Sequence, residues 1–177
     1  MQRWYRNPEM IVALAAVILS VFTVLVGAYS AMIDRAYARS SVWPRLEMGQ
    51  SYTQSSYGYF VSNRGTGPAL VEYVRLAVDG QPKADWAGVL DAYGAAEQRQ
   101  YLQSQIDGRT LSAGQDIQVF QTKDKNLIAS LLSADAPAMA VEICYCSIYQ
   151  QCWQVDQRNR PTEVDGCVLP ESERFLQ

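Results

Sequence analysis

The chain has 177 residues, of which 49% are hydrophobic and 19% are charged, and this composition excludes disordered, collagen-like and low-complexity proteins. It contains no histidine, which excludes catalytic triads and metal sites that depend on imidazole. The net charge is -3 and no cluster of lysine or arginine occurs, so nucleic acid is not an expected partner. The length of the chain predicts one domain with an attached segment.

The first predicted element is a membrane-spanning helix over residues 10–33 (MIVALAAVILSVFTVLVGAYSAMI), which contains no charged residue. A helix of this length crosses the roughly 30 Å hydrocarbon core of a bilayer. Asn7 is a candidate N-cap, Pro8 suits the first helical position, and Glu9 suits the first turn. We therefore expect a flank over 1–9, the transmembrane helix over 10–33, a linker over 34–44 and an extracytoplasmic domain over 45–177.

Two questions about this segment stay open from the sequence. A cleaved signal peptide is the alternative, with small residues at 36–38 or 28–30, although the apolar run exceeds a signal core of about 7 to 15 residues. The basic residues that flank the helix are nearly balanced, so charge does not decide its orientation.

One face of the predicted helix carries small residues that would let a second helix approach closely, either in a homodimer or with a lateral partner: Ala16, Ser20, Thr23, Gly27 and Ala31.

Beyond the helix, β-branched and aromatic runs separated by turn residues predict an antiparallel domain. In the run 70–78, Leu70 and Val74 fall on one face, with Glu72 as the exception, and Asp79-Gly80 follows as a turn. Strands are expected near 45–48 and at 57–62, 70–78, 111–121 and 138–149, with one or two short helices within 86–105 and another at 124–132. The sequence thus predicts a mainly-β, immunoglobulin-like β-sandwich with short helical insertions.

The segment 63–69 (NRGTGPA) resembles a phosphate-binding loop only superficially. Pro68 follows the second glycine at once, a third glycine is missing, and a strand comes next instead of a helix. We interpret it as a structural turn in which Asn63 bonds the turn backbone while Gly65 and Gly67 adopt positive φ.

All four cysteines lie in the last third of the chain. Cys144 and Cys146 point to the same face of a strand, which makes a bond between them difficult, and a hairpin loop over 148–150 would place Cys146 opposite Cys152. The pairs Cys146–Cys152 and, by elimination, Cys144–Cys167 follow, and two disulfides imply an oxidising compartment. Free buried thiols remain an alternative, as does a metal or redox site, although the spacing fits structural zinc poorly.

The segments 41–44 (SVWP), 63–69 (NRGTGPA), 144–147 (CYCS) and 152–153 (CW) resemble a group of bacterial, single-pass, membrane-anchored proteins of unknown activity. The resemblance implies this architecture and a bacterial origin, and it implies no catalytic residue. The bacterial inner membrane is the location that we expect for such a protein. We therefore expect a non-enzymatic protein with a periplasmic domain that binds another envelope protein and has no cofactor. A thiol redox or metal-handling protein is the alternative, and an enzyme with carboxylates gathered from distant positions is a third hypothesis.

Overall fold

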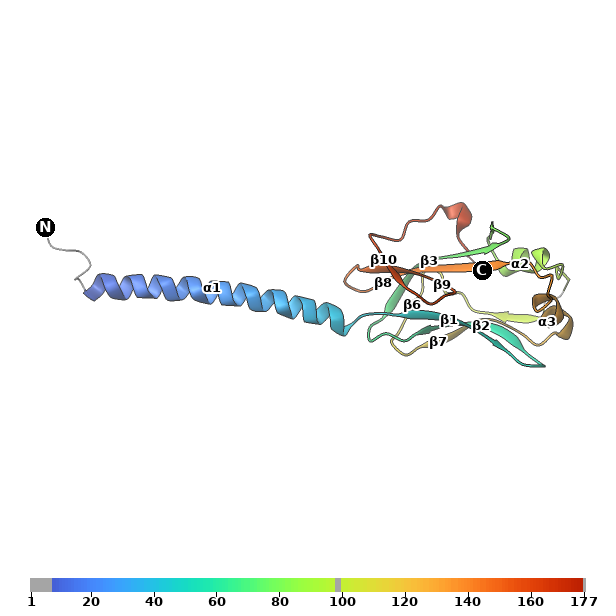
Figure 1. Ribbon diagram of the computed structural model, residues 1–177, viewed down its shortest axis with the longest axis horizontal. Helices are drawn as coiled ribbons and strands as arrows, with labels where there is room; N and C mark the ends of the chain where they lie inside the picture. The colour runs from blue at the N-terminus through green and yellow to red at the C-terminus, as the bar shows by residue number, and fades with distance from the viewer. Residues whose placement is uncertain (1–7, 98–99, 177) are drawn as a thin grey trace. The chain divides into compact units, whose positions relative to one another are not determined.

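The computed structural model describes residues 8–97 and 100–176, and the chain divides into two units between Ser41 and Val42 (Figure 1). The first unit contains helix α1 (Pro8–Ser41). The second unit, which we call the β domain, contains ten strands, two short α-helices and a short 3-10 helix within the described residues.

Helix α1 begins at Pro8 with Glu9 in its first turn, as predicted, whereas the predicted cap Asn7 lies outside the described residues. It is long and apolar enough to cross a membrane, and none of its described residues is buried. The helix continues beyond the apolar run to Ser41, so most of the expected 34–44 linker is helical. This segment lacks proline and glycine until Pro44, which explains the extension.

The β domain is built on two antiparallel sheets. The first has the strand order β1-β2-β7-β5, and the second has the path β10-β9-β8-β3-β4, with β6 pairing to β3. Their bounds are β1 (Leu46–Tyr52), β2 (Tyr57–Asn63), β3 (Ala69–Val78), β4 (Gln81–Lys83), β5 (Tyr101–Gln103), β6 (Thr110–Leu111), β7 (Asp116–Thr122), β8 (Met139–Cys146), β9 (Cys152–Asp156) and β10 (Thr162–Val164).

Local sequence signals account for the connections. Asp79 and Gly80 both have positive φ and link β3 to β4 in a two-residue turn, as expected. Asp85 caps helix α2 (Trp86–Ala92) by accepting a hydrogen bond from the Gly88 N–H. Asp124 caps helix α3 (Lys125–Leu131) by accepting hydrogen bonds from two backbone N–H groups of its first turn. A 3-10 helix, η2 (Glu171–Glu173), precedes the C-terminal Phe175, which is buried in the core.

The hydrophobic core contains side chains from both sheets and from α2 and α3. Its largest fully buried members include Tyr145, Phe120, Phe175, Leu46 and Leu76. Burial of this apolar surface is the main stabilising contribution to the β domain.

Two details of the secondary structure differ from expectation. Residues 101–103 form strand β5, although the helix-forming stretch within 86–105 favoured a helix. Tyr101 pairs with β7 and stacks on Phe120 at 5.4 Å, so tertiary pairing overrides helical propensity. In β3 the pairing with β8 shifts between Val71 and Tyr73, and this bulge turns Val71 instead of Leu70 into the core.

Candidate functional site

Both pairs of cysteines form disulfides in the β domain. The β8–β9 hairpin places Cys146 directly opposite Cys152, and these two residues are bonded with a Cα–Cα distance of 4.0 Å. Cys144 is bonded to Cys167, which follows β10, with a Cα–Cα distance of 5.7 Å. These are the pairs to which the hairpin argument from the sequence led.

The hairpin loop explains why the cysteines align. Gln150 has a φ of 62° at the last loop position, and the Ser147 N–H donates to the Gln151 carbonyl at 2.7 Å to close the loop. The Ser147 hydroxyl also accepts hydrogen bonds from the backbone N–H groups of Tyr149 and Gln151. The loop geometry therefore fixes the register that brings Cys146 to Cys152.

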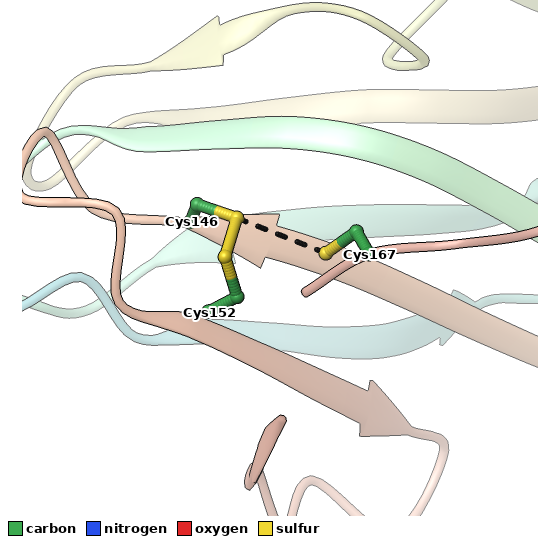
Figure 2. Close-up of side chains that lie close together, drawn as sticks. All are labelled: Cys146, Cys152 and Cys167. Carbon is green, nitrogen blue, oxygen red and sulfur yellow. Dashed lines mark hydrogen bonds between the residues drawn. A yellow bond between two sulfur atoms is a disulfide. The ribbon is translucent and has the colours of Figure 1, made fainter. Parts of the chain in front are cut away.

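The two disulfides lie next to each other. The Cys167 Sγ is 3.8 Å from the Cys146 Sγ, and the dashed line in Figure 2 marks this contact. The sulfurs of Cys146, Cys152 and Cys167 all lie within 4.8 Å of one another. Cys167 is half-buried, whereas the other cysteines are buried. The two bonds account for all four cysteines of the chain. In this oxidised state the sulfurs are not thiolates, and thiolates are the form that binds soft metals.

Asn63 is a fully buried hydrogen-bonding centre in the 63–69 turn. Its Nδ2 donates to the carbonyls of Gly67 at 2.8 Å and Leu111 at 3.0 Å. Its Oδ1 accepts from the backbone N–H groups of Gly65 at 3.0 Å and Arg45 at 3.2 Å. The expectation that Asn63 bonds the turn backbone is confirmed, and the same amide also joins the turn to β6 and to the segment before β1.

The expected role of the two glycines in this turn is wrong, because neither Gly65 nor Gly67 has a positive φ. They are required for close contact instead. A Cβ on Gly67 would overlap the Val42 carbonyl oxygen, and one on Gly65 would overlap the Trp43 carbonyl oxygen. Pro68 is half-buried and leads directly into β3. The turn thus packs backbone to backbone on the segment that enters the β domain.

The small residues predicted to form a helix-packing face lie on α1 and are exposed. The Ser20 hydroxyl donates to the Ala16 carbonyl, and the Thr23 hydroxyl donates to the Leu19 carbonyl, each at 2.8 Å. A Cβ on Gly27 would meet nothing within 4 Å, and Ala31 lies one turn further along. Use of this face by a second helix stays a prediction.

An apolar cavity of about 290 Å³ lies between the two sheets of the β domain. None of the described residues that line it is charged, and the exposed Gln50 and Gln157 show where it reaches the surface. Side chains from both sheets, from α2 and from the C-terminal segment line it, among them Met48, Phe60, Val119, Val141, Ile143 and Phe175.

Trp86 also lines the cavity, and its indole is part of an aromatic cluster. The ring centroid is 4.4 Å from that of Phe120 and 5.3 Å from that of Phe175. The Nε1–H is buried and has no hydrogen-bond partner within the described residues. A buried donor without a partner costs about 1 to 3 kcal/mol, so an acceptor that reached this N–H would stabilise the β domain.

A pair of tyrosine hydroxyls lies beside this cluster. The Tyr57 and Tyr59 oxygens are 2.8 Å apart, and the Gln50 Nε2 donates to the Tyr59 oxygen at 3.1 Å. Burial raises the pKa of both phenols above the ordinary value of 10, and in Tyr59 the hydrogen bond with Tyr57 raises it further. Both phenols are therefore neutral hydrogen-bonding groups at physiological pH.

Strand β1 forms one edge of its sheet, and the side chain of Asn159, in the loop between β9 and β10, bonds to its backbone. The Asn159 Oδ1 accepts from the Met48 N–H at 2.7 Å, and its Nδ2 donates to the Met48 carbonyl at 2.8 Å. Backbone groups of Met48 therefore point away from β2, and by the two-residue period those of Gln50 and Tyr52 do as well. In the described part of the chain no strand pairs with this side of β1.

Sequence reasoning found the cysteines and the turn but missed the cavity, Trp86 and the Asn159 bridge. The cavity depends on how two sheets diverge, which no local pattern encodes. A positive φ at Asn159 is typical of asparagine in turns, yet its partner lies 111 residues away in the sequence. A comparison with protein-family models finds no match, and a search among curated proteins finds no match to the chain either.

Proposed function

We propose that this chain is a non-enzymatic, single-pass membrane protein whose β domain binds another protein through the free edge of β1. The anchor would be α1, which has the length and apolarity of a membrane span. Its small-residue face would be available for self-association through a second α1 helix. A bacterial inner membrane, with the β domain in the periplasm, is part of the proposal and rests on the resemblance and on the two disulfides, which persist in oxidising compartments.

The topology supports an immunoglobulin-like assignment for the β domain. If β1, β2, β7 and β5 correspond to strands A, B, E and D, the first sheet has the order of an immunoglobulin sheet. The path β9-β8-β3-β4 then corresponds to G, F, C and C′. Domains of this architecture are common in surface recognition, although fold alone does not define a partner.

The single observation that carries protein binding is the length of the free β1 edge. Within the described residues the other end strands of the two sheets, β4, β5 and β10, have 3 residues each, which limits what can pair with them. Strand β1 has 7 residues, of which 49–52 lie past the Asn159 bridge. The outward N–H and C=O groups of Gln50 and Tyr52 in this part of the edge are available to an extended segment. Such strand addition is a recurrent mode of peptide recognition.

The test combines site-specific crosslinking with proline substitution in the full chain in cells. A photoreactive phenylalanine replaces Tyr52, whose side chain is 68% exposed. We expect one discrete crosslinked product that disappears in Gln50→Pro, because proline removes the outward N–H without breaking the β1–β2 ladder. Gln50→Ala is the matched control, because it also loses the side-chain bond to Tyr59 but keeps the N–H. A product that survives Gln50→Pro contradicts edge binding.

A second candidate function, thiol–disulfide exchange, is favoured by the 3.8 Å separation of the Cys167 and Cys146 sulfurs. A dithiol reductant would reduce Cys144–Cys167 to two thiols and become a disulfide itself. The Cys167 thiolate could then attack the Cys146 Sγ, forming Cys146–Cys167 and releasing Cys152 as a thiolate. Electrons balance, because the second step only exchanges one disulfide for another.

Partial reduction followed by mass mapping of the disulfides distinguishes thiol–disulfide exchange from a purely structural role of the cysteines. After limited treatment with dithiothreitol and alkylation, exchange requires a Cys146–Cys167 disulfide with alkylated Cys144 and Cys152. If only the two original disulfides and their reduced forms are found, the cysteines are structural. The edge-binding proposal is unaffected by either result, because β1 contains no cysteine.

A further inference from the structure

We infer that the apolar cavity of the β domain binds an uncharged single-chain lipid. The hydrocarbon chain would occupy the space between the sheets, and an oxygen of the lipid would accept a hydrogen bond from the Trp86 Nε1–H. The inference rests on the proposed membrane anchor for the source of the lipid, but the cavity itself is independent of that anchor.

The lining determines the chemical class. Aliphatic and aromatic side chains make up most of the walls, and the lining residues with a polar side-chain group are Gln50, Gln157, Tyr59 and Trp86. Water gains few hydrogen bonds in such a space, and apolar cavities of about 150 Å³ are known to stay dry and to accept small hydrocarbons. A charged headgroup would find no counter-ion among the lining residues, so the ligand is uncharged.

The volume of the cavity and its buried hydrogen-bond donor restrict the class of ligand further. A volume of about 290 Å³ lies at the lower limit for ligand sites, which suits one chain and excludes a two-chain lipid as a fully enclosed ligand. Trp86 is 4% exposed, and its Nε1–H has no partner among the described residues. A single acceptor, such as a hydroxyl or ester oxygen, would pair with this donor.

The short connection between α1 and the β domain agrees with a ligand that comes from the membrane. The exposed Gln50 and Gln157 lie where the cavity reaches the surface, and Gln50 belongs to β1, the first strand after α1. Residues 42–45 alone separate the end of α1 from the start of β1. A short tether of this kind keeps a domain at high effective concentration near whatever its anchor is embedded in.

The test uses the full chain in phospholipid nanodiscs that contain a long-chain alcohol with a diazirine in its chain. After illumination, mass spectrometry locates the labelled residues. We expect label on α1, which reports the membrane span, and separately on cavity residues in β1, β2 and β8. Label on α1 without label in the cavity overturns the lipid inference and leaves the anchor intact. Label in the cavity without label on α1 contradicts the anchor instead.

Two variants make the cavity result specific. Val141→Trp fills the half-buried end of the cavity, and we expect the cavity label to be lost while label on α1 is unchanged. Val168→Trp is the matched control, because Val168 is 89% exposed and does not line the cavity. If Val141→Trp does not melt cooperatively, the test uses Trp86→Phe, which keeps an aromatic ring but removes the N–H donor. We expect this variant to lose the cavity label as well. Cavity label that persists in the folded variant contradicts the inference.

Discussion

Asn63 connects three separate segments of the β domain through one buried amide. Its side chain makes four hydrogen bonds, which join the 63–69 turn, β6 and the residue before β1. A buried amide with all of its hydrogen-bonding capacity used specifies one arrangement of the surrounding backbone. Asparagine in a glycine-rich turn was a sufficient signal for the local bonds, but not for the bonds to Arg45 and Leu111.

We expect Asn63→Ala to lower the free energy of unfolding by about 3 kcal/mol, because it leaves buried backbone groups without partners. Chemical denaturation of the full chain in detergent, followed by tyrosine and tryptophan fluorescence, measures the change. Asn126→Ala is the control, because Asn126 is exposed near the start of α3. Equal stabilities for the two variants would contradict the structural role of Asn63.

Tyr73 gives a prediction for alkaline pH. Burial and the hydrogen bond that its hydroxyl donates to Glu142 raise its pKa to about 12. The folded chain therefore holds this proton more tightly than the unfolded chain, whose pKa is near 10, and stability falls as the pH rises between these values. We expect Tyr73→Phe to reduce the slope of unfolding free energy against pH in this window. An unchanged slope would show that Tyr73 does not contribute.

At the scale of elements, the sequence predicts a strand where apolar and polar residues alternate regularly. It predicts the wrong face for a residue where pairing with another strand interrupts this alternation. The pattern of residues 70–78 predicts a strand in which Leu70 lies on the same face as Val74. The bulge near Glu72 shifts the phase, so Val71 is buried at 3% exposure and Glu72 points to solvent. In the sequence this bulge is apparent only as the exception at Glu72 to the alternating pattern. The bulge itself is defined by the pairing of β3 with β8, which the sequence does not show.

The contact between the 63–69 turn and residues 42–45 depends on glycine. We expect Gly67→Ala to be strongly destabilising, by about 3 kcal/mol or more, because its Cβ would overlap the Val42 carbonyl and backbone cannot move as easily as a side chain. Gly166→Ala is the matched control, since a Cβ there meets nothing within 4 Å. Thermal melts of both variants compare the effects, and a harmless Gly67→Ala would contradict the close approach.

The two disulfides should differ in their contribution to stability. Cys144–Cys167 spans 23 residues and Cys146–Cys152 spans 6. The chain-entropy relation gives about 3 kcal/mol for the longer loop and about 2 kcal/mol for the shorter one. We therefore expect the double variant Cys144→Ser/Cys167→Ser to unfold at lower denaturant than Cys146→Ser/Cys152→Ser. The opposite order would mean that local strain or packing outweighs loop closure.

At the scale of the whole molecule, composition and the long apolar run predicted the division into a helix and a β domain. The cysteine pairing followed from hairpin register, which is a local property. The cavity and the β1 edge could not be predicted, because they arise from the spacing of two sheets and from strand order. The proposals on binding depend on the cavity and the β1 edge, which are long-range features. The architecture, in contrast, could be predicted from local features, the apolar run and the cysteine register.

The central claim is a membrane anchor with an oxidised β domain outside the cytoplasm. The most direct test treats spheroplasts with a membrane-impermeant maleimide, with and without an impermeant phosphine reductant, and counts modified thiols by mass spectrometry. The account predicts labelling only after reduction, with all four cysteines accessible to modification once both disulfides are open. Labelling that requires lysis but no reductant would contradict it, because the cysteines would then be free thiols in the cytoplasm.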